Sequence, residues 1–295
     1  MDFTTILILA VAIITLVLPS LFKKFYKGKT PLFMSFISCV VSALFFLFLS
    51  GFNLSFDSGL IVYSVWMASA FGIAVVFSTL AIQCGYLSLS GLIMSLSLVL
   101  PTLYGVIFLH NPVDLFFWIG MAALIASLVL VNVEFKKKKS DINAKSFQPK
   151  KKFNFKWLIF ITLGAVGNGF SSISQTAQQT AYAGDKKNEL MILALSIASI
   201  AILIASLIME RKNIKASIKG TLIWGSSSGL ATGILNYAVM LLVGLMDAAL
   251  LFPLISGGSL LITFVLAMII FKERYKILQY VGFVLGLLSV VLLNL

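Results

Sequence analysis

One apolar stretch of the chain, residues 157 to 180, carries more amide and hydroxyl side chains than hydrocarbon can accommodate. Asn168, Ser171 and Gln175 recur there at helical spacing, and the neighbouring positions 172, 178 and 179 are also polar. Since lipid cannot satisfy these groups, the stripe must face protein or water. Amides and hydroxyls bind a polar ligand by hydrogen bonds, so we predict that Asn168, Ser171 and Gln175 bind substrate. Hydrogen bonding between helices is the structural alternative.

This stripe has a definite depth if the stretch is a membrane-spanning helix. At a rise of about 1.5 Å per residue, Asn168 would lie roughly 16 Å from the start of the helix, near the middle of a bilayer. Gln175 would approach the far end. We expect Asn168→Ala and Gln175→Ala to lower transport of a substrate with little change in melting temperature.

A second polar pair, Asn236 and Tyr237, lies in the apolar stretch 220 to 243. These two residues are weaker candidates for substrate binding, because a hydrogen bond between helices would also explain them. They follow three glycines at intervals of four residues, which let a neighbouring helix approach closely: Gly225, Gly229 and Gly233.

Two other apolar stretches contain residues that weaken a helix. Pro253 removes one backbone N–H from the stretch 247 to 271, and Gly257 and Gly258 follow it. Pro101 occupies the stretch 87 to 109. We predict that Pro101, Pro253, Gly257 and Gly258 permit gating, because paired interruptions in two helices suit a moving element slightly better than static packing.

Other chemistry finds little support in the sequence. The acidic residues lie near the ends of apolar stretches or between them, so a buried proton-carrying carboxylate is not expected. Residues 225 to 229 spell G-x-S-x-G, but the single histidine is far away in the sequence and no strand precedes the motif. The two cysteines have no metal spacing. We therefore expect no enzyme activity, catalytic residue, cofactor or metal.

Composition places the chain in a membrane. Hydrophobic residues make up 60% of the 295 residues and charged residues 11%, and the mean hydropathy is +1.07, which exceeds what a soluble domain can bury. Windows of about 19 residues predict spans of the usual length. They lie near residues 3–22, 32–51, 59–83, 87–109, 114–134, 157–180, 188–209, 220–243, 247–271 and 276–295.

The chain divides into two similar halves. Laying Gly120 on Gly282 places Ser127 on Ser289 without a gap. Five spans in each half would turn the second copy upside down in the membrane, as in secondary transporters built from inverted repeats. We expect an all-α integral membrane fold of ten transmembrane helices in two inverted five-helix repeats, at residues 1–134 and 157–295, joined by a basic linker at 135–156.

The formal charge of +12 would suggest nucleic acid as a partner of a soluble protein, but its distribution favours a membrane. Of the 22 basic residues, all but Lys186 and Lys187 fall on one side of the predicted spans. The positive-inside rule makes that side cytoplasmic. We expect a multi-pass protein of the plasma membrane with the linker inside, both termini outside, and lipids but no nucleic acid as partners.

Several short segments resemble the EamA-like branch of the drug/metabolite transporter superfamily. These are residues 167–170 (GNGF), residues 271–274 (FKER), and Gly282 and Gly286 in the last span. The resemblance implies a ten-helix inner-membrane carrier with a central cavity, often exporting amino acids or other metabolites. The family's glutamate after the fourth span of each half is kept as Glu273, but the first half has Asn111. The family commonly has its termini inside, whereas the charge count predicts them outside.

These observations together predict a secondary transporter that exports or exchanges a small polar, amino-acid-like metabolite by alternating access. A multidrug or lipid-linked sugar translocator is an alternative within the same class, and a membrane scaffold without substrate is an alternative outside it. A homodimer is compatible with the sequence.

Overall fold

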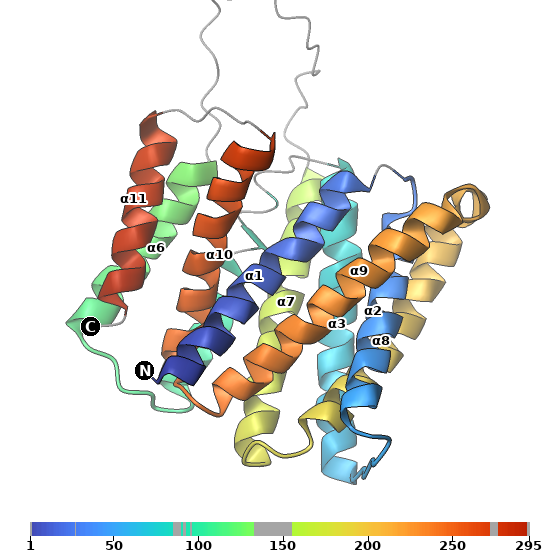
Figure 1. The fold of residues 1–295 in the computed structure, drawn as a ribbon, viewed down its shortest axis with the longest axis horizontal. Helices are drawn as coiled ribbons and strands as arrows, with labels where there is room; N and C mark the ends of the chain where they lie inside the picture. The colour runs from blue at the N-terminus through green and yellow to red at the C-terminus, as the bar shows by residue number, and fades with distance from the viewer. Residues whose placement is uncertain are drawn as a thin grey trace, which may run out of the picture.

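The computed structural model describes residues 2–26, 28–84, 90, 93–94, 96–132, 155–271 and 277–293. In these residues the chain is all α-helical, with ten helices and no strand (Figure 1). The predicted linker lies almost entirely outside the described residues, and so does Glu273. The helices are α1 (Phe3–Phe25), α2 (Pro31–Leu49), α3 (Ser58–Cys84), α5 (Val99–Ile107), α6 (Leu115–Asn132), α7 (Phe155–Ala181), α8 (Lys187–Met209), α9 (Arg211–Val243), α10 (Ala248–Phe271) and α11 (Ile277–Leu292).

Six of these helices are long and apolar enough to cross a membrane: α2, α3, α7, α8, α9 and α10. Shorter apolar helical segments lie in α1, α6 and α11. The outward surface is apolar as well, and α8 shows this well, because Ile200, Ile204 and Ile208 on one of its faces are 54 to 78% exposed. A water-soluble protein would bury such a face, so the chain has the features of a helical membrane protein.

The helices of the first half pack mainly against helices of the second half. Helix α3 lies against α7 and α8, helix α9 lies against α1 and α2, and α6 pairs with α11. The main contacts are unchanged when each helix is exchanged for its counterpart in the other half. The counterparts are α1 and α7, α2 and α8, α3 and α9, α5 and α10, and α6 and α11. The α3–α7 contact then becomes the α1–α9 contact, α3–α8 becomes α2–α9, and α1–α10 becomes α5–α7.

Two predicted spans differ from the observed helices. Helix α9 begins at Arg211 rather than near residue 220, because its first turns are basic and continue the helix beyond the apolar part. The predicted span 87–109 is interrupted. Ser97 and Leu98 form a turn, and α5 begins only at Val99. A hydropathy window detects neither event, since it reports burial in lipid and not backbone continuity.

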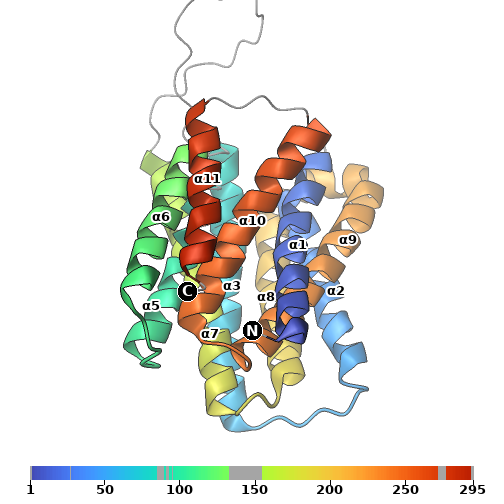
Figure 2. The ribbon, with the colours of Figure 1, turned by 60° about the vertical axis from the view of Figure 1, so that its left-hand side comes forward.

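Both termini lie at one end of the bundle, which we call the terminal end (Figures 1 and 2). The first turns of α7 and α9 lie at the opposite end, which we call the basic end. The basic end carries the described basic residues Lys29, Lys156, Arg211, Lys212, Lys215 and Lys219, whereas Lys186 and Lys187 lie at the terminal end. All of these basic residues except Lys186 and Lys187 therefore lie at one end of the bundle, as the sequence predicts.

A buried carboxylate stabilises the start of α2 at the basic end. Glu210, which is 4% exposed, accepts hydrogen bonds of 2.9 Å from the backbone N–H groups of both Leu32 and Phe33. These are first-turn N–H groups that have no partner within the helix, and the carboxylate also faces the positive end of the helix dipole. Beside it, the hydroxyl of Tyr26 bonds to Thr221 at 2.7 Å. These contacts join the two halves.

Loss of this carboxylate should destabilise the fold. Glu210→Ala leaves two buried N–H groups without an acceptor, which costs about 2 kcal/mol and lowers the melting temperature of the purified protein. Glu189→Ala removes an acidic residue from the first turn of α8 and serves as the control, with a smaller expected effect. Equal melting temperatures for the two variants would contradict this role of Glu210.

A second polar cluster joins the halves at the terminal end. The carboxylate of Asp57, just before α3, accepts hydrogen bonds from the hydroxyl of Tyr182 at 2.6 Å and from Nζ of Lys186 at 2.8 Å. It also accepts one from the N–H of Leu60 at 2.8 Å. The hydrogen bonds from Lys186 and Tyr182 hold the pKa of Asp57 well below its usual range.

The Asp57 cluster predicts a pH-dependent contribution to stability. Because the folded-state pKa is depressed, the contribution is complete above the ordinary pKa of about 3.9 and is lost as the pH falls toward the folded value. The melting-temperature difference between the wild type and Asp57→Asn should be constant near neutral pH and shrink in acid. Asp114→Asn, whose carboxylate accepts the N–H of Phe117, is the control. A difference that grows in acid would refute the assignment.

Candidate functional site

The polar residues of α7 are fixed in place by glycine contacts on two sides of the helix. A Cβ added at Gly167 would lie 2.6 Å from the backbone oxygen of Ala70 in α3. One added at Gly169 would lie 2.8 Å from the backbone oxygen of Ser97, just before α5. A third face of α7 is apolar and exposed, with Ile159, Leu163, Val166 and Phe170 on it. The buried polar side chains between these faces, from Ser171 to Gln179, therefore point into the bundle.

Asn168 meets the interruption in the predicted fourth span. Its Nδ2 donates a hydrogen bond of 2.7 Å to Oγ of Ser97, and Ser97 Oγ donates to the carbonyl of Met94 at 2.6 Å. Ser97 and Leu98 form a turn between the helical residue Leu96 and the start of α5. Broken helices are tolerated at membrane depth where they are buried in protein or line a water-filled cavity. Asn168 is half-buried at this point.

Gln175 and Asn236 form a buried pair between α7 and α9. Nε2 of Gln175 donates to Oδ1 of Asn236 at 3.0 Å, and Nδ2 of Asn236 donates to the carbonyl of Thr232 at 2.8 Å. The two side chains are only 5% and 8% exposed. Gln175→Ala would therefore leave a buried amide oxygen without its donor, at a cost of about 1 to 3 kcal/mol. We therefore expect Gln175→Ala to lower the melting temperature as well, which replaces the sequence-based prediction of little change.

The other predicted binding residues divide between two environments. Ser171 is buried one turn before Gln175 on the same side of α7. Tyr237 instead packs against the hydrophobic cluster that contains Phe46, with the two ring centroids 6.3 Å apart. The structure thus brings Ser171, Gln175 and Asn236 to one region of the bundle and directs Tyr237 to another.

The predicted gating residues lie in tight contacts. Pro253 is inside a helix that is continuous from Ala248 to Phe271, and Pro101 is the third residue of α5, where a missing N–H costs little. A Cβ at Gly258 would lie 2.5 Å from Ile13 in α1. One at Gly257 would lie 3.1 Å from a methyl group of Val290 in α11. In this conformation Gly258 and Gly257 therefore allow α10 to pack closely against α1 and α11.

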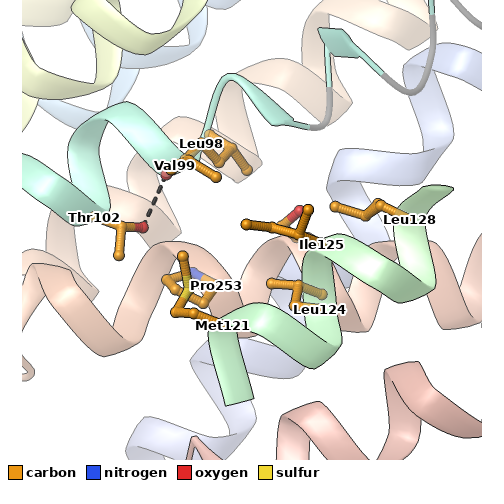
Figure 3. A pocket seen from close by; sticks show the side chains of 9 residues that line it. Leu98, Val99, Thr102, Met121, Leu124, Ile125, Leu128 and Pro253 are labelled. Carbon is orange, nitrogen blue, oxygen red and sulfur yellow. Dashed lines mark hydrogen bonds between the residues drawn. The ribbon is translucent and has the colours of Figure 1, made fainter. Parts of the chain in front are cut away.

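Pro253 also borders a small apolar pocket between α5, α6 and α10 (Figure 3). Most of its lining is aliphatic, and the hydroxyl of Thr102, the polar group nearest the turn, is bonded to the carbonyl of Leu98 at 2.9 Å. The volume of about 10 Å³ is close to the least that holds one water molecule. This pocket is too small and too apolar for a metabolite.

A larger and more polar pocket lies at the terminal end and was missed by sequence reasoning. It has a volume of about 280 Å³ and is formed by the ends of α5, α7 and α9 and the start of α10, hence by helices of both halves. Its lining residues are Leu109, Asn111, Thr176, Thr180, Val243, Met246, Asp247 and Ala248.

The terminal pocket is formed by the same two helices, α7 and α9, that carry the buried amide pair. Thr176 follows Gln175 directly in α7, and Val243 lies seven residues, or two helical turns, beyond Asn236 in α9. Positions seven residues apart share one face of a helix. The α9 face that lines the pocket therefore continues inward to Asn236, about 10 Å deeper, whereas Gln175 lies beside Thr176 on the next face of α7 at nearly the same depth.

The entrance of the pocket is fixed by one amide. Nδ2 of Asn111 donates to Oδ1 of Asp247 at 3.0 Å, while Oδ1 of Asn111 accepts the N–H of Ala249 in the first turn of α10 at 3.3 Å. The sequence offered a weak signal here, because Asn111 occupies the place of Glu273 in the repeat alignment. It gave no reason to pair Asn111 with Asp247.

The fold has relatives among solved structures. One solved crystal structure, described simply as that of a protein, is similar over 98% of this chain and 96% of its own, with a TM-score of 0.74 and 13% sequence identity. It is one of 28 solved chains that match this fold. At that identity the likeness establishes a shared fold and says nothing about activity. No family model and no curated protein matches the sequence.

Proposed function

We propose that this chain is a secondary transporter that moves a small polar metabolite by alternating access. The observation that carries the proposal is the buried Gln175–Asn236 pair, in which Gln175 directly precedes Thr176 of the terminal pocket. Polar side chains inside an apolar bundle are rare and are kept where they serve binding or packing, and this pair adjoins a polar pocket formed by both halves. A carrier needs such a site at the interface between its halves.

The arrangement of the helices supports ten spans in two inverted repeats. The contacts between α1 to α6 and α7 to α11 are preserved when the halves are exchanged. At each end of the bundle, polar groups near the start of the third helix of one half bond to residues near the end of the first helix of the other half. Asp57 bonds to Tyr182 at one end, and Thr221 bonds to Tyr26 at the other. Two copies of opposite orientation would produce this pattern.

The size of the pocket favours a small substrate. Pockets for drug-sized ligands span roughly 300 to 1,000 Å³, and this one has about 280 Å³. Its polar lining suits a metabolite better than a lipophilic drug or a lipid-linked sugar. A scaffold would have no use for a polar pocket that leads inward, although its amides could still hold helices together.

Location and family complete the proposal. The charge asymmetry between the ends supports a plasma-membrane protein with the basic end in the cytoplasm and both termini outside. Membership of the EamA-like branch of the drug/metabolite transporters rests on the short resemblances at residues 167–170 and 271–274 and on the ten-helix plan. Export or exchange of the metabolite follows from that assignment.

A metabolite-wide thermal-shift screen on the purified protein tests the proposal. A ligand that binds the folded state raises the melting temperature by mass action. Compounds that do so should then exchange across proteoliposomes that contain the protein and not across empty liposomes. Binding without any exchange would favour a receptor or a scaffold, and the absence of any stabilising metabolite would count against a substrate site.

A further inference from the structure

We infer that the terminal pocket recognises a protonated amine, with the carboxylate of Asp247 as its acceptor. This inference rests on the proposed transport function and gives the substrate a chemical class. Asp247 is the only charged residue among those that line the pocket. One oxygen of its carboxylate accepts a hydrogen bond from Asn111, and the hydroxyl oxygens of Thr176 and Thr180 in the same pocket can accept further hydrogen bonds.

The carboxylate of Asp247 is held in position without being neutralised. Asn111 donates from Nδ2 to Oδ1 of Asp247 at 3.0 Å. The orientation of this amide is fixed, because its own Oδ1 accepts the N–H of Ala249 and its backbone N–H bonds to the carbonyl of Gly105 at 3.1 Å. A Cβ at Gly105 would lie 2.7 Å from both Oδ1 of Asn111 and the N atom of Ala249, so only glycine fits beneath the amide.

No basic side chain in the described part of the chain forms an ion pair with Asp247. The nearest candidates along the chain at the terminal end are Lys186 and Lys187, and Lys186 is bonded to Asp57. Asn111 offers hydrogen bonds but no charge. A carboxylate with one hydrogen-bond donor and no cation leaves its second oxygen available to a positively charged ligand.

The hydroxyl oxygens of Thr176 and Thr180, which line the same pocket, can accept hydrogen bonds from a ligand because their protons are already used within α7. The hydroxyl of Thr176 donates to the carbonyl of Ser172 at 3.1 Å, and that of Thr180 donates to the carbonyl of Thr176 at 3.0 Å. Each hydroxyl has one proton, so the lone pairs of both oxygens remain for a ligand. An ammonium group has three donors and no acceptor, which complements one carboxylate and two hydroxyl oxygens. An anionic ligand would find repulsion from Asp247 instead.

A matched set of probes tests this assignment on the wild-type protein. The panel contains amino acids, amino-acid amides and short diamines, each beside its fully N-acetylated derivative, which has no ammonium group. We expect at least one amine to raise the melting temperature and its N-acetyl partner to have no effect. Stabilisation by the acetylated compounds, or by anions, would overturn the inference, as would the absence of any stabilising amine.

Two variants then test the residue. Asp247→Asn should weaken binding of the stabilising amine by about ten- to a hundredfold, whereas Asp114→Asn, whose carboxylate accepts the N–H of Phe117 outside the pocket, should not. Asp247→Ser provides a second variant if the asparagine variant melts early. Unchanged amine affinity in a folded Asp247 variant would overturn the inference.

The outcome also separates this inference from the transport proposal. If neutral metabolites bind and exchange across proteoliposomes, and Asp247→Asn does not alter their affinity, the amine site is wrong while the carrier stands. If an amine binds at Asp247 but never crosses the membrane, the site is right and the carrier is wrong. If neither binding nor exchange is found for any compound, both fail.

Discussion

Replacing Gln175 and Asn236 together by leucine is expected to abolish ligand binding and transport while the protein stays folded. In the wild type one hydrogen bond, from Nε2 of Gln175 to Oδ1 of Asn236, joins the two amides across α7 and α9. Removing both partners leaves neither orphaned, so the stability change should be small. Gln175→Leu alone should cost about 1 to 3 kcal/mol, because Oδ1 of Asn236 then lacks its donor. The comparison separates a binding role from a structural one.

The measurements are the melting temperature and the affinity for the compound found by thermal shift, in both single variants and the double variant. Asn213→Leu, on the same helix but at the basic end, controls for the loss of an amide as such. A double variant that melts like the wild type and still binds with wild-type affinity would assign the pair to helix packing alone. A double variant less stable than either single variant would contradict the mutual satisfaction of the amides.

Among single glycine-to-alanine variants, we expect Gly167→Ala to lose the most stability. Its Cβ would lie 2.6 Å from the backbone oxygen of Ala70 and 2.8 Å from the backbone nitrogen of Ala74. Neither atom belongs to a flexible side chain, so α3 and α7 would have to move apart along the interface. Overpacking of this kind costs about 3 kcal/mol, and membrane helices depend on such close approach for association.

Gly72→Ala is the matched control, because Gly72 lies in the same α3 helix and its added Cβ would have no atom within 4 Å. There the higher helix propensity of alanine should leave the melting temperature unchanged or raise it, by up to about 1 kcal/mol of stability. Thermal unfolding of both variants in detergent measures the contrast. Similar melting temperatures for the two variants would mean that α3 and α7 are not packed as closely as described.

Much of the fold could be predicted from hydropathy, because a helix that crosses lipid must be apolar along its whole length. The predicted stretch 188–209 coincides with α8 almost to the residue. The basic first turns of α9 were missed, since a helix that continues beyond the apolar part loses its hydropathy signal. The turn at Ser97 and Leu98 was missed for a different reason: both residues are compatible with a helix, and tertiary contacts such as the one from Asn168 accompany the break.

The candidate site was predictable only where polarity stood out against apolar surroundings. Gln175 was found because an amide in an apolar helix needs a partner, but its partner lies 61 residues away and no spacing rule names it. The terminal pocket is assembled from helix ends, where Asn111 and Asp247 look like ordinary boundary residues. Only the folded chain shows that these two side chains meet.

The central claim, a water-accessible path along the polar face of α7, is tested most directly by cysteine accessibility. Single cysteines would replace Asn168, Ser171 and Thr176, with Val166→Cys on the exposed apolar face of the same helix as the control. Cys39 and Cys84 would first be changed to alanine. A charged, membrane-impermeant thiol reagent is then applied from each side of sealed vesicles.

We predict that the reagent modifies the cysteines at positions 168, 171 and 176 and spares the one at position 166, which lipid covers. A bound ligand should slow the modification at 171 and 176. Unreactive thiols at all three positions from both sides, with a control at the exposed Thr180 still reactive, would mean a solid centre without water and would contradict the account.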